Sequence, residues 1–358
     1  RFATRGYVKL DVIQDFDYVG NRFEFYVPSI PVDGEPDASL DGRTTFHAKE
    51  SRIGFDFRKK VTNANGKEYP LQVFLELDFF DDREDFRLQP RMRHAYGVLG
   101  RVLGGQTWST STDMTALAGT IDFDAGDALY GDRVSQIRWA DRLNDTITWA
   151  IALEENKSDV GNPLGFDGSN RADTPNLAGN LRWTSGRAHL GLGYDIFGID
   201  WQGGSTGPDD STIGWGVALT GRYLLGEDAR NALSGQLTVG EGSAFRVLSF
   251  SGAAAGAVLD PQGNIETLEH WQAYLAYNHY WSQSLNSSFV FAHSSVDTTD
   301  YQAPSAIESV STVHANLIWF PYNAVSTGVE LMWGERENRD GASGDAVRLQ
   351  YMLKFKFN

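Results

Sequence analysis

The chain contains no cysteine and no long run of apolar residues. Without cysteine it has no disulfides and no thiolate metal sites, which fits an oxidising compartment. No apolar run approaches the roughly eighteen residues of a membrane-spanning helix, so any membrane crossing must use strands. Its 31 basic residues are outnumbered by 47 acidic ones, which argues against a nucleic-acid partner. The acidic total does not exclude an anion-selective pore, because pore selectivity depends on the charges that line the lumen.

Glycine and aromatic residues are plentiful, with 38 Gly, 10 Trp, 14 Tyr and 21 Phe among 358 residues. This composition suits short strands joined by turns, with aromatic side chains available for interfacial girdles. No linker or composition break divides the chain, and we predict one outer-membrane β-barrel over residues 1–358. The chain begins at Arg1 with neither Met nor a secretory leader, and we expect a processed or trimmed form.

The clearest pattern lies at residues 347–358, which alternate between an apolar face and a face of mainly Arg, Gln and Lys. A period of two indicates a strand with one apolar and one polar side. The alternation recurs about sixteen times along the chain, and short Gly, Asn, Asp, Ser and Pro turns alternate with long acidic loops. We therefore predict an all-β fold, a transmembrane antiparallel β-barrel of about sixteen strands in the bacterial outer membrane. Its turns would be periplasmic, its long loops external, and one loop would fold into the pore.

The apolar face is predicted to point outward, because a ring of about sixteen strands is too wide for inward side chains to fill. If that face contacts lipid, each Arg or Lys on it would destabilise the barrel by about 2–4 kcal/mol at mid-bilayer. The apolar face carries essentially no Arg or Lys there. The charged face then lines an aqueous lumen. The predicted pore-lining residues are Arg52, Arg58, Arg91, Arg93, Arg101, Arg138, Arg182, Arg222 and Arg348.

These arginines carry the functional prediction. Guanidinium groups keep their charge and present paired donors that match carboxylates, so the lumen should favour small organic anions. The alternative for any single arginine is a structural ion pair with a carboxylate of a neighbouring strand, such as Asp56, Glu76, Asp78 or Glu154.

The loop at about 109–132 is long enough to fold into the lumen and form a constriction. Its acidic side chains would then face the wall arginines across the pore and create a transverse field. The alternative is an external loop like the others. The predicted constriction residues are Asp113, Asp122, Asp124 and Asp127.

No motif points to catalysis, a cofactor or a metal. Residues 203–207 match the G-x-S-x-G pattern, but both flanks read as loop, whereas a nucleophile elbow needs a strand before it and a helix after it. The seven histidines are scattered without metal spacing, and His94 and His279 are predicted near the aromatic belts. Carboxylate pairs in the loops suit solvated charge or divalent ions that bridge lipopolysaccharide.

One short stretch reads Gly-Gly-Gln-Thr-Trp-Ser-Thr at 104–110, and others lie at 120–123, 134–139, 314–321, 328–331 and 348–350. Together these stretches resemble the DcaP-like porins. The resemblance implies a homotrimer of sixteen-stranded barrels, a constriction loop after Trp108 and a path for dicarboxylate-like anions. It also implies pore-wall roles for Arg91, Arg93, Arg138 and Arg348. The N-terminal helical extension of family members is absent from this sequence, and Asn358 stands after the usual terminal aromatic.

Together these patterns favour a passive, non-enzymatic diffusion channel for small anions such as dicarboxylates, with outer-membrane lipid and lipopolysaccharide as its surroundings. A sugar-type porin is the alternative within the same class, and it would need aromatic ladders in the lumen. An outer-membrane barrel enzyme or adhesin is the alternative from a different class.

Overall fold

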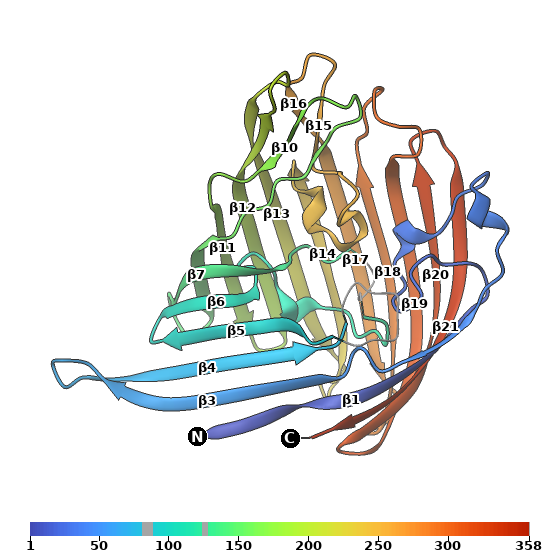
Figure 1. Cartoon of the computed structure of the whole chain (residues 1–358). Coiled ribbons are helices and arrows are strands. Elements are labelled where there is room, and N and C mark those ends of the chain that lie inside the picture. Colours follow the sequence, from blue (N-terminus) through green and yellow to red (C-terminus); the bar gives the residue numbers. More distant parts are fainter. Residues whose placement is uncertain (81–88, 124–127, 358) are drawn as a thin grey trace.

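The structure is a computed structural model that describes residues 1–80, 89–123 and 128–357 (Figure 1). Sixteen antiparallel strands form a closed ring, as predicted. The ring consists, in order, of β1 (Phe2–Asp15), β3 (Arg52–Thr62), β4 (Glu68–Asp78), β5 (Arg91–Leu99), β6 (Val102–Trp108), β7 (Arg133–Arg142), β8 (Ile147–Glu154), β11 (Asn176–Ser185), β12 (Ala188–Gly203), β13 (Asp210–Leu225), β14 (Asn231–Glu241), β17 (Glu269–Tyr280), β18 (Leu285–Val296), β19 (Ile307–Tyr322), β20 (Val325–Asn338) and β21 (Ser343–Lys356).

The first and last strands close the ring. Antiparallel pairing of β1 with β21 runs from Tyr7 opposite Lys356 to Asp15 opposite Arg348. This seam brings the two ends of the chain close together (Figure 1). Closure leaves the ring without a free sheet edge, as a strand-built membrane protein requires.

Side-chain exposure follows the predicted alternation of faces. Outward apolar side chains are exposed, for example Ile137 at 69% and Ile213 at 67%, whereas inward Lys9, Asp15 and Arg348 are at most 1% exposed. The apolar side chains thus cover the outside of the barrel and the charged ones point inward. In the described residues no helix has the length and apolar content to span a membrane.

One strand departs from the predicted pattern. The register of β4 with β5 shifts between Glu76 and Leu77, so that Arg93 has no partner of its own and forms a bulge. A bulge adds one residue and reverses the faces beyond it. His94 and Tyr96 consequently point into the lumen beside Phe74, with ring centroids 6.1 and 5.6 Å from the Phe74 ring. Strict alternation through residues 91–98 predicts His94 and Tyr96 on the lipid face together with Met92, and for His94 and Tyr96 this prediction is wrong.

Turns and loops alternate in length at the two ends of the barrel. The short turns lie at 63–67, 100–101, 143–146, 186–187, 226–230, 281–284 and 323–324. Most of the opposite connections are long and carry the remaining elements, which are β2 (Thr44–His47), β9 (Val160–Gly161), β10 (Gly168–Arg171), β15 (Ala257–Leu259), β16 (Ile265–Thr267), and the 3₁₀ turns η1 (Val27–Ser29), η2 (Pro36–Ser39), η3 (Met114–Ala116), η4 (Ala244–Arg246) and η5 (Leu248–Phe250). Two of these connections are short as well, because β12 and β13 leave only residues 204–209 between them, and β20 and β21 leave only residues 339–342.

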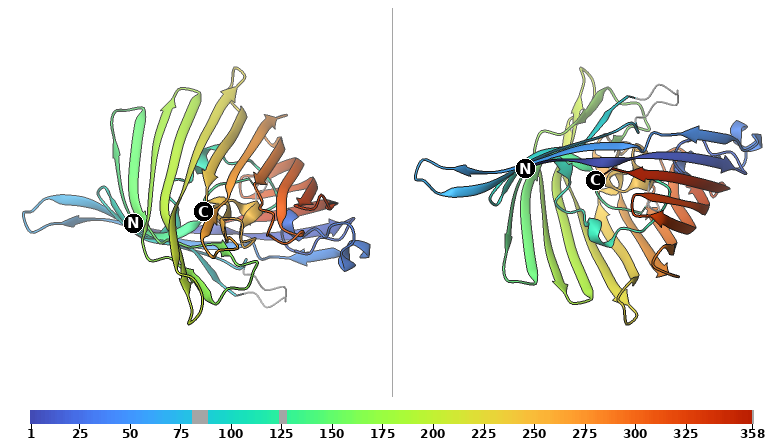
Figure 2. Two further views of the ribbon diagram at one scale, coloured as in Figure 1. Left: turned by 90° about the horizontal axis from the view of Figure 1, so that it is seen from above. Right: turned by 90° about the horizontal axis from the view of Figure 1, so that it is seen from below.

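An apolar cluster fills part of the external half of the lumen. Segments 16–43, 109–123, 128–132 and 242–268 fold inward and contribute Phe25, Val27, Tyr130, Val247 and Phe250, all fully buried. The sequence did not predict this cluster. Figure 2 shows the segments around 109–132 and 242–268 inside the arc of strands.

The wall beneath this cluster is apolar as well. Inward side chains of β13, β18, β19, β20 and β21 pack against the inward segments, and these side chains are Ala218, Val296, Val310, Met332 and Ala346. Water is therefore excluded from this side of the external half.

Candidate pore and its inward loop

The described residues of the segment after β6, 109–123 and 128–132, are called the inward loop below. The loop leaves the wall at the end of β6 and is fixed at once to β8. The carboxylate of Glu154 accepts hydrogen bonds from Ser109 Oγ at 2.7 Å and from the Thr110 backbone N–H at 2.6 Å. The side chain of Asn180 on β11 donates to the Thr110 carbonyl at 2.5 Å. Because these groups point into the barrel, they turn the loop inward rather than toward the external medium.

Asp113 is the next anchor of the inward loop. It accepts hydrogen bonds from His189 Nε2 on β12 at 2.7 Å and from Thr220 Oγ1 on β13 at 2.8 Å. Burial alone would raise the pKa of Asp113, but the hydrogen bond from His189 and the charge of Arg182 outweigh it and lower the pKa to about 2. The carboxylate thus stabilises the folded loop above the ordinary aspartate pKa, and this contribution is lost as the pH falls toward 2.

Replacing Asp113 with alanine is expected to destabilise the barrel by about 1–3 kcal/mol, because His189 and Thr220 lose a buried partner. The loop would also be less firmly held, so single-channel current noise should increase. Urea unfolding and planar-bilayer recordings measure the two effects. The matched control is Asp173→Ala in an exposed loop, which should change neither. A quiet, fully stable D113A channel would contradict the anchoring role.

The far part of the inward loop is fixed to the opposite wall. The Glu330 carboxylate on β20 accepts from the backbone N–H groups of Ile121 at 2.7 Å and Asp122 at 3.1 Å. On β19, the Asn316 side chain donates to the Gly119 carbonyl at 2.8 Å. Residues 109–122 therefore follow the inner wall from β8 through β11, β12 and β13 to β19 and β20.

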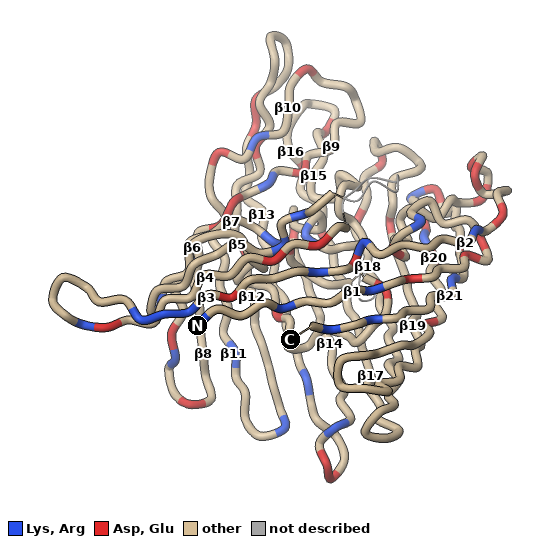
Figure 3. The backbone as a smooth tube through the Cα atoms, turned by 60° about the horizontal axis from the view of Figure 1, so that its bottom comes forward, with Lys and Arg blue, Asp and Glu red and all other residues tan. Residues whose placement is uncertain are grey.

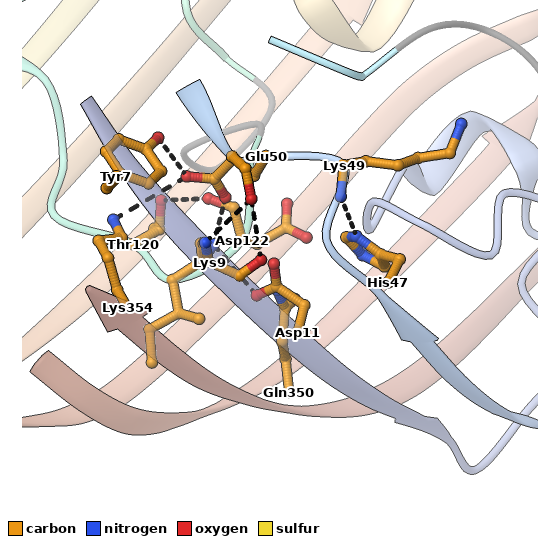
Figure 4. Close-up of polar contacts among 12 residues, drawn as sticks. Tyr7, Lys9, Asp11, His47, Lys49, Glu50, Thr120, Asp122, Gln350 and Lys354 are labelled. Carbon is orange, nitrogen blue, oxygen red and sulfur yellow. Dashed lines mark hydrogen bonds and ion pairs between the residues drawn. The ribbon is translucent and has the colours of Figure 1, made fainter. Parts of the chain in front are cut away.

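The same part of the loop contacts the seam. Lys9 Nζ on β1 donates to the Ile121 carbonyl at 2.7 Å and forms ion pairs with Glu50 and, at 3.1 Å, with Asp11. Tyr7 Oη donates to Glu50 at 3.0 Å. Figure 4 shows these polar groups gathered between the loop and the closing strands. Loop position and barrel closure are thus linked through one buried lysine.

The two predicted constriction aspartates that the structure describes do not face open water. Asp113 is 3% exposed and Asp122 is 4% exposed. Asp122 accepts a hydrogen bond from the backbone N–H of Phe25 at 3.0 Å, which joins the inward loop to segment 16–43. Both carboxylates hold the loop in place and do not project into the lumen. Asp124 and Asp127 lie outside the described residues.

Several of the predicted wall arginines are neutralised by carboxylates. Arg348 is fully buried, bonds to Asp15 at 2.5 Å and lies over the Phe25 ring. Arg58 makes two hydrogen bonds to Asp56, at 2.9 and 2.8 Å. The alternative of structural ion pairing therefore holds for these two, and Arg348 is covered by segment 16–43 rather than open to solutes.

Arg101 occupies a different place from the other predicted arginines. It lies in the turn between β5 and β6, is exposed, and pairs with Asp141 at 2.9 Å. Its neighbours in sequence, Leu99 and Val102, face outward. Arg101 is therefore at the rim of the barrel and is not part of the lumen wall.

Arg91 and Arg93 share one carboxylate, Asp78, at 2.9 and 2.7 Å, and Arg93 also contacts Glu76 at 3.1 Å. Together with Arg52 they surround Phe123 of the inward loop. Their guanidinium carbons lie 5.4, 5.4 and 5.9 Å from the Phe123 ring centroid for Arg91, Arg93 and Arg52 respectively. Such cation–π contacts hold the guanidinium groups in place.

Phe123 also stacks on Phe80, with ring centroids 4.3 Å apart. The sequence analysis missed this aromatic pair as a part of the site. In the sequence Phe80 precedes two aspartates and Phe123 stands between two others, so only the path of the chain brings this pair to the arginines. Arg133 was missed as well, and its guanidinium lies 4.9 Å above the Trp108 ring.

Arg138 and Arg182 differ from the others because backbone carbonyls hold them. Arg138 donates to the Trp108 carbonyl at 2.5 Å and to Gln136 at 2.7 Å. Arg182 donates to the Thr112 carbonyl at 2.6 Å, and its Nε is 4.0 Å from Asp113. In the described part of the chain Arg138 has no carboxylate at ion-pair distance.

The inner wall beside these two arginines carries small side chains. Ala150 and Ala152 of β8 and Ala178 of β11 point inward there and are at most 7% exposed. The two positive charges repel each other, since each lies within the field of the other.

Arg222 is on the inner face of β13 near the short-turn end, exposed and without a described carboxylate partner. Within the described residues no group of three His, Cys, Asp or Glu side chains is arranged to hold a metal.

A family model described as DcaP outer membrane protein matches residues 1–357. The chain belongs to the DcaP outer membrane protein family. This DcaP family member is a channel of the bacterial outer membrane and not an enzyme. A search of the curated proteins finds no match.

Solved structures support the same fold for this DcaP family member. The outer membrane channel DcaP of Acinetobacter baumannii superimposes with a TM-score of 0.85 at 22% identity, covering 99% of this chain and 97% of that chain. The anion-selective porin from Comamonas acidovorans gives a TM-score of 0.62 at 11% identity, covering 100% and 99%. The trimer form of OmpT, an outer membrane protein of Vibrio cholerae, gives 0.55 at 12% identity, covering 100% and 99%.

Proposed function

We propose that this channel lets small anionic solutes, dicarboxylates among them, diffuse passively across the outer membrane. Selectivity comes from the guanidinium groups of the lumen wall and from the inward loop, which narrows the pore. The solute is drawn in by electrostatic complementarity, and no conformational work is required.

The way in which Arg138 and Arg182 are held is the single observation that carries this proposal. Their guanidinium groups are held by backbone carbonyls, which position the fork without adding a countercharge. Within the described residues Arg138 has no carboxylate at ion-pair distance, and the one carboxylate near Arg182 is Asp113, at 4.0 Å. A carboxylate that enters between them finds two forked donors, each suited to bidentate hydrogen bonding. Arg91 and Arg52 on the facing part of the wall extend the positive path beside Phe123.

Two relatives lend support by analogy. The Comamonas acidovorans porin of similar fold is described as anion-selective, and the Vibrio cholerae protein of similar fold has a trimer form. We accordingly propose a homotrimer for this chain, surrounded by outer-membrane lipid and lipopolysaccharide.

A sugar-type porin is the second candidate, and one observation favours it. Phe74, His94 and Tyr96 form a group of rings on the lumen wall, with Phe74 and Tyr96 centroids 5.6 Å apart. Sugars pack on the faces of aromatic rings in their binding sites. Here, however, the rings stand next to the unpaired charge of Arg138, and a neutral solute would not need that charge.

The direct test is the reversal potential of the purified wild-type channel in a planar bilayer under a potassium chloride gradient. A potential of the sign that reports chloride permeation is the expected result. Added succinate should reduce chloride current in a concentration-dependent way, whereas maltose should not. A cation-selective wild-type channel would end the anion proposal, and current block by maltose alone would favour the sugar alternative.

A further inference from the structure

The hairpin of β3 and β4 extends beyond the rest of the barrel at the short-turn end. Strand β1 pairs with β3 only as far as Phe57, and β5 pairs with β4 only from Leu71 onward. Residues 59–69, called the hairpin arm below, therefore have ladder partners only within the β3–β4 pair itself. Figures 1 and 3 show the arm projecting to one side. An isolated two-stranded hairpin is only marginally stable in water, so its surroundings matter.

A groove of about 770 Å³ lies between the arm and the outer surface of β5 to β7. The barrel side of this groove is apolar, because Leu99, Val102 and Trp139 face outward and are exposed. The arm side is formed by Val61 and Tyr69, which pair across the hairpin on the outward face. Both walls therefore combine aliphatic and aromatic side chains at the level where the strands leave the membrane.

The rim of the groove is positively charged. Lys67 lines the groove and lies 5.3 Å from the centroid of the Tyr69 ring. Lys59 stands on the same arm outside the groove lining, 5.9 Å from the centroid of the Phe57 ring. Within the described residues neither lysine pairs with a carboxylate, and Arg101 at the other rim pairs only with Asp141. This local excess of positive charge stands on a chain whose formal charge is −16.

We propose that the groove binds an anionic phospholipid of the periplasmic leaflet. One acyl chain packs against Leu99, Val102 and Trp139, and the phosphate accepts hydrogen bonds from Lys67 and Arg101. Such contacts usually involve aromatic rings at the membrane boundary. They also involve lysines whose stems lie along apolar surface while their ammonium groups reach the headgroups. The bound lipid would also cover the arm and hold it against the barrel.

Charge decides between this occupant and a second copy of the chain. A second copy is strongly acidic overall, but its own outward face at this height is apolar and would leave Lys59 and Lys67 without counter-charges. A phosphodiester supplies the missing negative charge and an acyl chain together. The proposal does not depend on the solute that the pore carries.

The experiment uses the full chain in nanodiscs that contain equal amounts of phosphatidylglycerol and phosphatidylcholine, followed by native mass spectrometry of retained lipid. Wild-type protein should retain phosphatidylglycerol about thirtyfold better than the Lys67→Gln/Arg101→Gln variant, which corresponds to about 1 kcal/mol for each of two charges. Wild-type protein should not retain phosphatidylcholine to the same extent.

The matched control is Arg187→Gln/Arg230→Gln, which removes two exposed arginines from other short turns and should retain phosphatidylglycerol like the wild type. The heat-dependent gel shift of folded barrels checks that each variant folds. Equal retention of both lipids by the wild type, or unchanged phosphatidylglycerol retention in the double variant, would overturn the proposal. Loss of oligomers in that variant with lipid retention unchanged would assign the groove to a second copy instead.

Discussion

Replacing Arg138 and Arg182 together with glutamate should convert an anion-preferring channel into a cation-preferring one. The double change moves the local charge from +2 to −2 at a place where no carboxylate balances Arg138 in the described residues. Two unit charges about 4 Å apart interact by about 1 kcal/mol in water and about 4 kcal/mol at an effective dielectric constant of 20, so the effect on ion occupancy is large. The reversal potential under a salt gradient should therefore change sign.

The control for this variant makes the same change of charge outside the lumen. Lys67→Glu/Arg101→Glu alters the hairpin arm and the rim, and should leave the reversal potential as in the wild type. Lysine at positions 138 and 182 should keep the anion preference but weaken succinate block, because an ammonium group cannot form the bidentate fork. An R138E/R182E channel with unchanged ion preference would remove these residues from the solute path.

The sequence could not separate these two arginines from Arg91, Arg93 and Arg348. All five stand at inward positions of strands in which apolar and polar residues alternate. This alternation is a local property of the sequence. What distinguishes them is the partner, and partners come from distant segments. Arg348 meets Asp15 across the seam, 333 residues away in the chain. The period of a strand predicts which way a side chain points, but not which charge it meets.

The bulge in β5 shows a second limit of periodic patterns. Residues 91–98 alternate well enough to predict a strand, but the extra residue at Arg93 reverses the faces beyond it. His94 and Tyr96 were therefore predicted in contact with lipid, whereas they form part of the lumen wall. The residue that disturbs the period is itself one of the predicted pore residues, which is consistent with the frequent occurrence of bulges near functional sites.

The apolar cluster inside the barrel left a signal that the sequence analysis did not use. Val296, Val310 and Met332 stand on the inward face of β18, β19 and β20, where an aqueous lumen would call for polar side chains. Apolar residues on the polar face of strands near the external end indicate that something covers them. The covering segments contain Phe25, Val27 and Phe250, and the two sets together could have predicted that the lumen is partly filled on that side.

Substitution of Lys9 by methionine should destabilise the barrel more than any change at an exposed ion pair. Lys9 is 1% exposed and is the shared partner of Asp11, Glu50 and the Ile121 carbonyl. Removing one member of a buried ion pair typically costs about 3–5 kcal/mol, because the remaining charge is left uncompensated. The loss falls on the seam and on the inward loop at once, so the urea unfolding midpoint should fall.

Two further variants separate charge from packing in this result. Lys9→Met/Glu50→Gln removes one of the two negative charges left behind, those of Glu50 and Asp11, and should regain part of the lost stability, since only Asp11 then lacks its counter-ion. Lys60→Met breaks an exposed ion pair with Glu68 at 2.8 Å and should cost at most about 1 kcal/mol. If Lys9→Met proved as mild as Lys60→Met, the seam would be held by its backbone ladder alone. The buried lysine would then have no part in closing the barrel or in holding the loop that narrows it.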